Sequence, residues 1–305
     1  MGATNFAELN QQFGIFGQLN VKSGSVALPL IEVENANARA RISAYGSHIL
    51  SFKPHGHEDV LWISQKSDYE SGKPIRGGIP ICWPWFGSHP TDPQIPIHGF
   101  VRRVPWRILS TEKIDEGTTR IEIGLTHAEA MHETWRHRYE LKSVITVSEQ
   151  LDLELITRNI GDEAIVFSEA LHTYFNVSEI SEIEIEGLAG CAYIEEIDAR
   201  KTHAIEPGKI RFNSEVDRVY QDTTAECIII DPGFQRKIRI GKSGSLTTVV
   251  WNPWIAKSKR MPDFDDEEYH TMVCVETANA MKNTITLKPG ETHSIRTQLS
   301  VESIL

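Results

Sequence analysis

Three polar side chains stand in otherwise apolar stretches of this 305-residue sequence. His98 lies in the segment Ile-His-Gly-Phe-Val-Arg, His172 in Ala-Leu-His-Thr-Tyr-Phe, and Glu276 at the end of Met-Val-Cys-Val-Glu. Burying such a group costs free energy unless it is hydrogen-bonded or paired. Each one alone is explained most simply as a structural hydrogen-bonding group. The three together, beside loops rich in proline and aromatic residues, define a candidate site.

A histidine and a glutamate in one site can move two protons at once. A carboxylate removes the proton of a hydroxyl group while an imidazolium donates a proton to a neighbouring oxygen. Opening the hemiacetal ring of a sugar requires this combination, because the anomeric hydroxyl loses a proton and the ring oxygen gains one. Reclosure on the other face of the carbonyl inverts the anomeric centre. The reaction uses neither a metal nor a nucleotide, so we predict no cofactor.

Two other classes of function remain open at this point. A carbohydrate-binding β-sandwich without catalysis would use the same loops, although it would not need the acid–base couple of His172 and Glu276. A metalloenzyme would use His98, His172 and Glu276 as a two-histidine, one-carboxylate ligand set. The acidic run at 263–268 lacks the spacing of an EF-hand and predicts a solvated loop rather than a calcium site.

The elements that must position these side chains are predicted to be β-strands. Residues 120–125 alternate between apolar and polar side chains, as expected for a half-buried strand. Similar patterns interrupted by a turn predict hairpins over 138–160 and 284–301. The same reasoning predicts further strands at 26–34, 38–45, 164–176, 183–187, 191–196, 226–231, 236–241, 246–251 and 271–277.

Helical spacing is confined to two short segments. Phe6, Leu9 and Phe13 recur at helical intervals, which predicts a short docking helix, and 128–135 is the other candidate. Nothing repeats at a fixed period, and no low-complexity linker divides the chain. We therefore predict an all-β fold, a large antiparallel β-sandwich with few short helices. It is expected to form one domain over 1–305, with 1–20 as an N-terminal docking segment.

Two proline-rich segments break the succession of strands. Residues 73–96 contain six prolines together with Trp83 and Trp85, and 251–266 contain two prolines and a second tryptophan pair. Proline does not fit a central strand, so both segments are predicted to be long ordered loops, which are often functional. Their aromatic rings would suit the apolar faces of a sugar, and they would equally suit closing the end of a sandwich.

The overall charge limits the classes of partner. The chain carries 31 Lys and Arg against 42 Asp and Glu residues, a formal net charge of −11 at pH 7. A general binder of nucleic acid or of an anionic membrane needs a basic face, so we expect neither partner.

No segment approaches the roughly 20 apolar residues that span a bilayer. No secretory leader is recognisable and the four cysteines are scattered, so a cytoplasmic protein with reduced thiols is predicted, with monomer as the default.

Four motifs carry a resemblance to a known family. Arg76 begins Arg-Gly-Gly-Ile-Pro-Ile-Cys-Trp-Pro, His98 begins His-Gly-Phe-Val-Arg, and His172 and Glu276 lie in Leu-His-Thr-Tyr-Phe and Val-Glu-Thr-Ala-Asn. In this order they resemble the glucose-6-phosphate 1-epimerase group of the aldose 1-epimerase (galactose mutarotase-like) family. The resemblance covers nearly the whole chain. It implies a large antiparallel sandwich with the sugar bound in an open cleft.

The resemblance also implies a role for each candidate residue. His172 would be the general acid on the ring oxygen, and Glu276 the general base on the anomeric hydroxyl. Asp217 would bind sugar hydroxyls, and His98 would position the substrate. The remaining two, Arg76 and Arg102, would contact the substrate, and arginine forks suit a phosphate group. The expected partner is therefore a small sugar phosphate, most simply glucose 6-phosphate.

The segment around His98 is predicted to be a strand. Period two then places His98 and Arg102 on one side and Arg103 on the other, facing solvent or another partner. Ile97 departs from the family pattern, because some relatives have glutamine there and isoleucine cannot supply that hydrogen bond.

Overall fold

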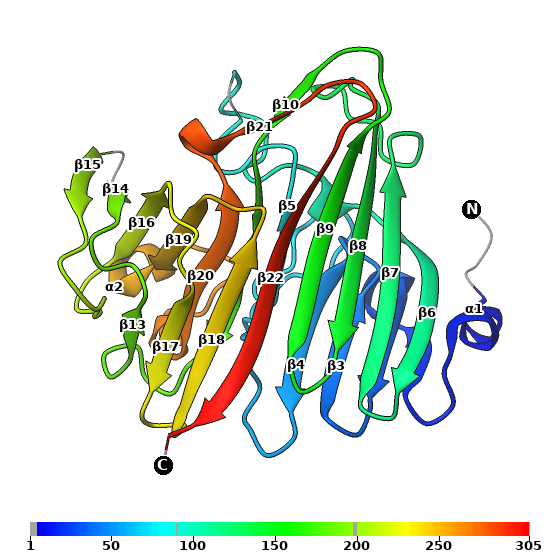
Figure 1. The fold of residues 1–305 in the computed structure, drawn as a ribbon, viewed down its shortest axis with the longest axis horizontal. Helices are drawn as coiled ribbons and strands as arrows, with labels where there is room; N and C mark the ends of the chain where they lie inside the picture. Colours follow the sequence, from blue (N-terminus) through cyan, green and yellow to red (C-terminus); the bar gives the residue numbers. More distant parts are fainter. Residues whose placement is uncertain (1–4, 90, 198–199, 305) are drawn as a thin grey trace.

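One antiparallel β-sheet runs the whole length of the molecule in the order β13-β17-β18-β22-β9-β8-β7-β6 (Figure 1). The computed structural model describes residues 5–89, 91–197 and 200–304. The strands of this long sheet are β6 (Arg107–Asp115), β7 (Thr118–Thr126), β8 (Tyr139–Val147), β9 (Leu151–Asn159), β13 (Glu184–Glu186), β17 (Cys227–Asp231), β18 (Arg236–Ser243) and β22 (Thr292–Ser303).

A second sheet of eight strands carries the candidate site. Its order is β15-β14-β16-β19-β20-β11-β5, and β12 also pairs with β20. The strands are β5 (Ile81–Cys82), β11 (Glu169–Leu171), β12 (Tyr174–Asn176), β14 (Ala192–Ile197), β15 (Arg200–Ile205), β16 (Val216–Gln221), β19 (Thr247–Asn252) and β20 (Met272–Asn279).

Two smaller sheets and a few short helices complete the described chain. A four-stranded sheet has the order β1-β2-β3-β4, and β10 pairs with β21. These elements are β1 (Leu19–Ser23), β2 (Pro29–Glu34), β3 (Ala38–Ser43), β4 (His48–Pro54), β10 (Ile165–Phe167), β21 (Ile285–Leu287), α1 (Phe6–Phe13), α2 (Trp254–Ser258) and the 3-10 turns η1 (Ser25–Ala27), η2 (Val101–Arg103), η3 (Glu268–Thr271) and η4 (Met281–Asn283). In the described part of the chain, no helix is long and apolar enough to cross a bilayer.

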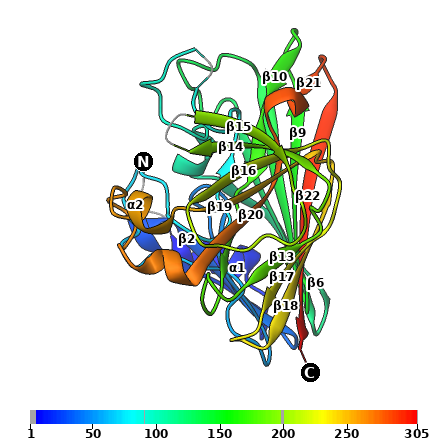
Figure 2. The ribbon, with the colours of Figure 1, turned by 90° about the vertical axis from the view of Figure 1, so that its left-hand side faces the viewer.

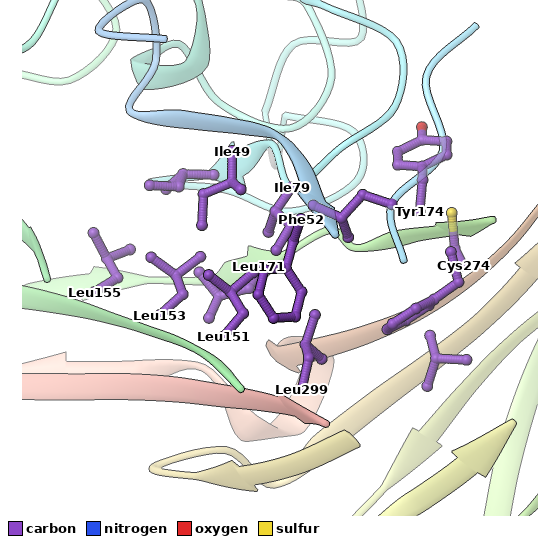
Figure 3. Packing of buried hydrophobic residues seen from close by; sticks show 14 of the residues in the cluster. Ile49, Phe52, Ile79, Leu151, Leu153, Leu155, Leu171, Tyr174, Cys274 and Leu299 are labelled. Atoms are coloured by element: carbon purple, nitrogen blue, oxygen red, sulfur yellow. The ribbon is translucent and has the colours of Figure 1, made fainter. Parts of the chain in front are cut away.

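The sheets pack as layers around a shared apolar core. The second sheet and the four-stranded sheet lie against the same face of the long sheet (Figures 1 and 2). Figure 3 shows Phe52 of β4, Leu153 of β9 and Leu299 of β22 meeting in this core, and all three are buried. Along β9, buried leucines alternate with half-exposed polar residues, because one face of the strand meets the core and the other meets water. The predicted antiparallel sandwich with few short helices is confirmed.

The predicted N-terminal helix is present as α1. The side chain of Asn5 caps its first turn by accepting a hydrogen bond from the Glu8 amide at 3.3 Å. The Thr111 hydroxyl of β6 donates to the Phe13 carbonyl at 2.7 Å, and the Val21 amide of β1 donates to the Asn10 side chain at 2.7 Å. These bonds attach the helix to two sheets. Residues 1–4 of the predicted docking segment lie outside the described residues.

One predicted hairpin is confirmed and the other is wrong. β8 and β9 pair along their whole length, as expected for 138–160. In 284–301, by contrast, β21 pairs with β10, whereas β22 lies between β18 and β9. The alternating apolar face of β22 matches the core-facing leucines of β9, and this long pairing outweighs a local hairpin.

The helix predicted at 128–135 is also wrong, because this segment forms turns. The Glu129 carboxylate accepts hydrogen bonds from both the amide and the hydroxyl of Thr126, each at 2.8 Å. The Ala130 carbonyl accepts from the Tyr139 hydroxyl at 2.8 Å. These side-chain bonds hold the segment as a series of turns, with the Glu129 and Ala130 amides both donating to the Thr126 carbonyl.

Candidate active site

A cavity of about 640 Å³ opens over one face of the second sheet. Cross-strand partners point to the same side of an antiparallel sheet, and this rule assembles the wall of the cavity. Asp217 of β16 lies opposite Trp251 of β19, which lies opposite Cys274 of β20. One step along the same face, Val249 lies opposite Glu276. Three neighbouring strands thus place Asp217, Trp251 and Glu276 in the lining of one cavity.

His172 stands opposite Glu276 across the next strand boundary. Strands β11 and β12 both pair with β20 in one continuous register, and His172 and Thr173 are the two residues between them. The prediction of a single strand over 164–176 is therefore only partly right, since β10, β11 and β12 are separate. The His172 amide donates to the Pro80 carbonyl at 3.0 Å, which ties this junction to the Arg-Gly-Gly-Ile-Pro loop.

The imidazole and the carboxylate form a close, buried pair. The Nε2 atom of His172 lies 3.4 Å from Oε1 of Glu276, and the two side chains are 9% and 2% exposed. Burial raises the pKa of Glu276 well above its usual value, and the nearby charge of Asp217 adds to the rise. Burial lowers the pKa of His172 well below its usual value, with Arg102 and Arg76 adding to the effect. Both shifts disfavour the charged forms, so burial alone works against an ion pair between the two groups.

His98 lines the same cavity, although its segment is not a strand. His98 and Gly99 have φ values of 63° and 70°, and η2 follows immediately. A Cβ atom at Gly99 would lie 1.8 Å from the Trp83 carbonyl oxygen, so this close approach requires glycine and bends the chain. The strand prediction is wrong for this reason. The Gly87 amide donates to Nδ1 of His98 at 3.2 Å, which leaves the proton of the neutral ring on Nε2.

Arg76 reaches the cavity from a tightly packed glycine turn. Gly78 has a φ of 62°, and a Cβ atom there would lie 2.2 Å from the Ile49 carbonyl oxygen. The neighbouring Gly77 carbonyl lies 2.7 Å from Nε2 of the buried His48. Close packing on one side and a buried imidazole on the other therefore fix the backbone that carries Arg76.

The guanidinium of Arg76 is held by two partners. Its Nε and Nη2 atoms donate to the two carboxylate oxygens of Asp263 at 3.1 Å each, and Nη1 donates to the Tyr174 hydroxyl at 3.0 Å. Asp263 does not line the cavity, whereas Arg76 and Tyr174 do. The acidic run at 263–268 was predicted to be a solvated loop. Asp263 departs from this prediction, because its side chain is only 14% exposed and orients Arg76.

The structure does not bring Arg102 to the cavity wall. Its side chain is buried, and Nη2 donates to the Ile97 carbonyl at 3.0 Å. The Nε atoms of Arg102 and Arg103 are both buried without a hydrogen-bond partner, so Arg103 does not simply face solvent. The cause is the 3-10 turn at 101–103, which replaces the alternation of a strand. A direct contact of Arg102 with substrate stays a prediction.

Asp217 is paired with a lysine that the sequence did not single out. Nζ of Lys257 lies 3.1 Å from Asp217 and 3.2 Å from Glu215, and it stands 5.6 Å from the Trp251 ring centroid. Burial raises the pKa of Asp217, and Lys257 opposes this rise. Lys257 and the exposed Lys201 both line the cavity, so it contains cationic groups besides Arg76.

The aromatic residues of the two loops divide into two groups. Trp83 and Trp85 are 0% and 4% exposed and belong to the core, so they close the sandwich rather than offer a sugar platform. Phe86 and Trp251 line the cavity. Tyr174, which stacks on His172 at 4.8 Å with an interplanar angle of 8°, was missed although it lies two residues away on the same side of the chain.

Potential metal ligands were also predicted around His172. The set that the structure brings together consists of His172, Cys274 and Glu276, whose ligand atoms lie within 4.8 Å of one another. His98 is not a member of this set, although its ring centroid lies 5.4 Å from that of His172. The structure therefore does not support the predicted set with two histidines.

Known proteins resemble this chain over most of its length. The sequence profile described as aldose 1-epimerase matches residues 29–300. Proteins of Escherichia coli and Salmonella typhimurium, each named “Putative glucose-6-phosphate 1-epimerase”, are 35% and 37% identical to it, covering 87% and 83% of this chain and 88% and 84% of their own. The crystal structure of a mutarotase-type protein from Salmonella typhimurium superposes with a TM-score of 0.87 at 30% identity, covering 97% of this chain and 99% of that one.

The β-sandwich fold and these matches place the chain in the class of mutarotase-like sugar isomerases. Within that class, the chain belongs to the aldose 1-epimerase family. The family predicted from the four motifs is confirmed, and the protein is an isomerase that takes a sugar substrate.

Proposed function

We propose that this protein interconverts the α and β anomers of an aldohexose 6-phosphate, with glucose 6-phosphate as the first candidate. The observation that carries the proposal is the pairing of His172 and Glu276 at 3.4 Å in a cavity that Arg76 also lines. The names of the relatives at 35% and 37% identity support the same substrate. A carbohydrate-binding protein without catalysis would not require this buried acid–base pair.

The reaction needs only two proton transfers in each direction. Glu276, as a carboxylate, takes the proton of the anomeric hydroxyl while protonated His172 gives a proton to the ring oxygen. The bond between the anomeric carbon and the ring oxygen breaks, and the aldehyde forms. After rotation of the carbonyl, the two residues reverse their roles and the ring closes as the other anomer. No atom is gained or lost.

Both pKa shifts oppose the ion pair from which catalysis starts. Burial favours the neutral imidazole and the protonated carboxyl, whereas catalysis starts from imidazolium and carboxylate. Arg76 and Arg102 contribute to the low pKa of His172. A phosphate dianion beside Arg76 would offset this positive charge and so favour the ion pair. The phosphate group would therefore promote catalysis as well as binding.

The other predicted side chains receive positioning roles in this proposal. Asp217 accepts hydrogen bonds from sugar hydroxyls, and His98 donates from Nε2. Arg76 receives the phosphate together with Lys257 or Lys201, which are the other cations of the cavity. Arg102 supports the site electrostatically from its buried position. The cytoplasmic location, the monomeric state and the single domain remain predictions.

Exchange spectroscopy by NMR tests the function directly. The rate of exchange between anomers is measured for glucose, galactose and their 6-phosphates, and the enzyme-free rate is subtracted because spontaneous mutarotation occurs. We expect faster exchange with all active substrates and the highest kcat/KM with a 6-phosphate. Exchange that equals the enzyme-free rate for all four sugars would refute the proposal and favour a binding protein. His172→Ala is the matched control for contaminating activity.

A further inference from the structure

Cys274 lies beside the catalytic pair but takes no part in the proposed reaction. It precedes Glu276 by two residues on β20, so both side chains point to the same face of the sheet. Its cross-strand partners are Trp251 and Tyr174, which both line the cavity. Figure 3 shows the Cys274 sulfur on the same side of β20 as the Tyr174 ring. The thiol is fully buried and is not part of a disulfide.

The three side chains lie close to the separation that a tetrahedral metal ion requires. The ligand atoms of His172, Cys274 and Glu276 lie within 4.8 Å of one another, and one pair, Nε2 and Oε1, is 3.4 Å apart. Zinc bonds of about 2.0–2.3 Å to nitrogen, oxygen and sulfur give ligand-to-ligand separations of about 3.3–3.6 Å. A shift of the thiol by roughly an ångström would complete the geometry.

Two buried atoms of this group lack a hydrogen-bond partner. Nδ1 of His172 and Oε2 of Glu276 are both buried and form no hydrogen bond. An ion bound by the carboxylate would give Oε2 a partner, whereas Nδ1 lies across the ring from Nε2 and is not satisfied by it. The open cavity leaves room for a water molecule in the fourth position, as in zinc sites with three protein ligands.

We propose that His172, Cys274 and Glu276 form an inhibitory site for zinc, or for another divalent transition metal that prefers the same ligands, at the position where the sugar reacts. Thiolate, imidazole and carboxylate together are a ligand set that zinc accepts. Zinc binds the thiolate and the carboxylate forms, and their two negative charges balance the ion. Asp217 adds negative charge nearby, whereas Arg102 opposes it.

The metal would inhibit the reaction because it binds the same side-chain atoms that act on the substrate. A metal ion on His172 and Glu276 occupies the groups that must exchange protons with the substrate, so metal and sugar exclude each other. This part of the inference rests on the proposed function. Metal binding itself does not rest on the proposed function, because it can be measured with the metal alone.

Cobalt(II) is the probe for binding. It is titrated into the reduced, metal-free protein, and a thiolate-to-cobalt charge-transfer band is expected to saturate at one ion per chain and to disappear on addition of zinc. The band should be absent from Cys274→Ala and Cys274→Ser. Cys227→Ala, which removes another buried thiol that is not part of this group, should retain it. Absence of the band from the wild type, or its persistence in both Cys274 variants, would overturn the proposal.

Zinc inhibition is the second measurement. Zinc should inhibit anomer exchange competitively with the sugar, and the inhibition constant should rise at least about 10-fold in Cys274→Ala. Turnover of this variant without zinc should remain near that of the wild type, because the thiol takes no part in proton transfer. If the wild type lacks epimerase activity but shows the cobalt band, the proposed function fails and the metal site stands. Inhibition that is equal in both Cys274 variants and the wild type would contradict the site.

Discussion

Arg76 and Asp263 form a two-bond, fork-to-fork ion pair although 187 positions separate them in the sequence. The pair fixes the plane of the guanidinium, and the Tyr174 hydroxyl fixes its remaining terminal nitrogen. Asp263 itself stays outside the cavity lining. The loop after α2 therefore decides how Arg76 is presented to the substrate.

Asp263→Asn should weaken binding of sugar phosphates selectively. The amide cannot accept two charge-assisted hydrogen bonds, so Arg76 loses its fixed orientation. We expect KM for glucose 6-phosphate to rise by about 10-fold, with kcat/KM for glucose nearly unchanged. Steady-state NMR exchange rates for both sugars give the comparison. A lower KM for the phosphate would instead identify Asp263 as a competitor that the phosphate displaces.

Arg76→Ala removes the positive charge itself. A hydrogen bond to a charged group is worth about 1.5–3 kcal/mol, so kcat/KM for a 6-phosphate should fall by about 10- to 100-fold. Free sugars should be affected less. Arg102→Ala makes the useful comparison, because Arg102 is buried beneath the site and should change kcat through the pKa of His172. Equal losses for phosphorylated and free sugars in Arg76→Ala would argue against a phosphate role.

His172→Ala should lower turnover by about 10²–10⁴-fold, which is the usual scale for losing a general acid. Spectroscopic confirmation that the variant is folded must accompany the rate, since His172 is buried beside Tyr174. Turnover near that of the wild type would remove His172 from the mechanism.

Glu276→Gln should be similarly damaging, by about 10²–10⁴-fold, because it keeps the shape of the side chain and removes its basicity. Its thermal stability should not fall, since the variant replaces a buried acid whose pKa is raised by burial with a neutral amide. Thermal unfolding and exchange rates on the same sample separate the two effects. A folded variant with normal turnover would contradict the base assignment.

His48 should make the fold less stable in acid. Burial lowers its pKa to about 4, so the neutral form is the folded form. Stability from this residue is complete above the unfolded pKa of about 6.5 and is lost as the pH falls toward 4. Over this interval the wild type should lose about 3 kcal/mol more than His48→Gln in denaturant unfolding. Parallel curves for the two proteins would show that His48 is not the group responsible.

Local patterns in the sequence were sufficient to predict the fold class and to single out His172 and Glu276, which the structure brings together. Alternation identified β8 and β9, because both have one face in the core. Polar residues in apolar stretches identified His172 and Glu276, because burial without pairing is costly. The family resemblance added Arg76, Asp217 and Arg102, of which Arg76 and Asp217 line the cavity and Arg102 does not.

The missed features depend on contacts between distant residues. The long pairing of β22 with β9 leaves β21 to pair with β10 rather than with β22. The bend at His98 is decided by the contact of Gly99 with Trp83, which no local pattern reports. Asp263 looked like one member of a solvated acidic run until Arg76 was placed beside it. Periodicity describes neighbours along the chain, and these contacts join segments far apart.

The position of β20 between β19 and β11 ties activity to the completion of folding. β19 and β20 are close in the chain, whereas β11 and β12 precede β20 by about a hundred residues. His172 and Glu276 therefore meet only when a loop of that length closes, which is among the slow events for β-rich topologies. A refolding chain should regain β-structure signals before it regains turnover. Enzyme activity would then serve as a late reporter of long-range sheet closure.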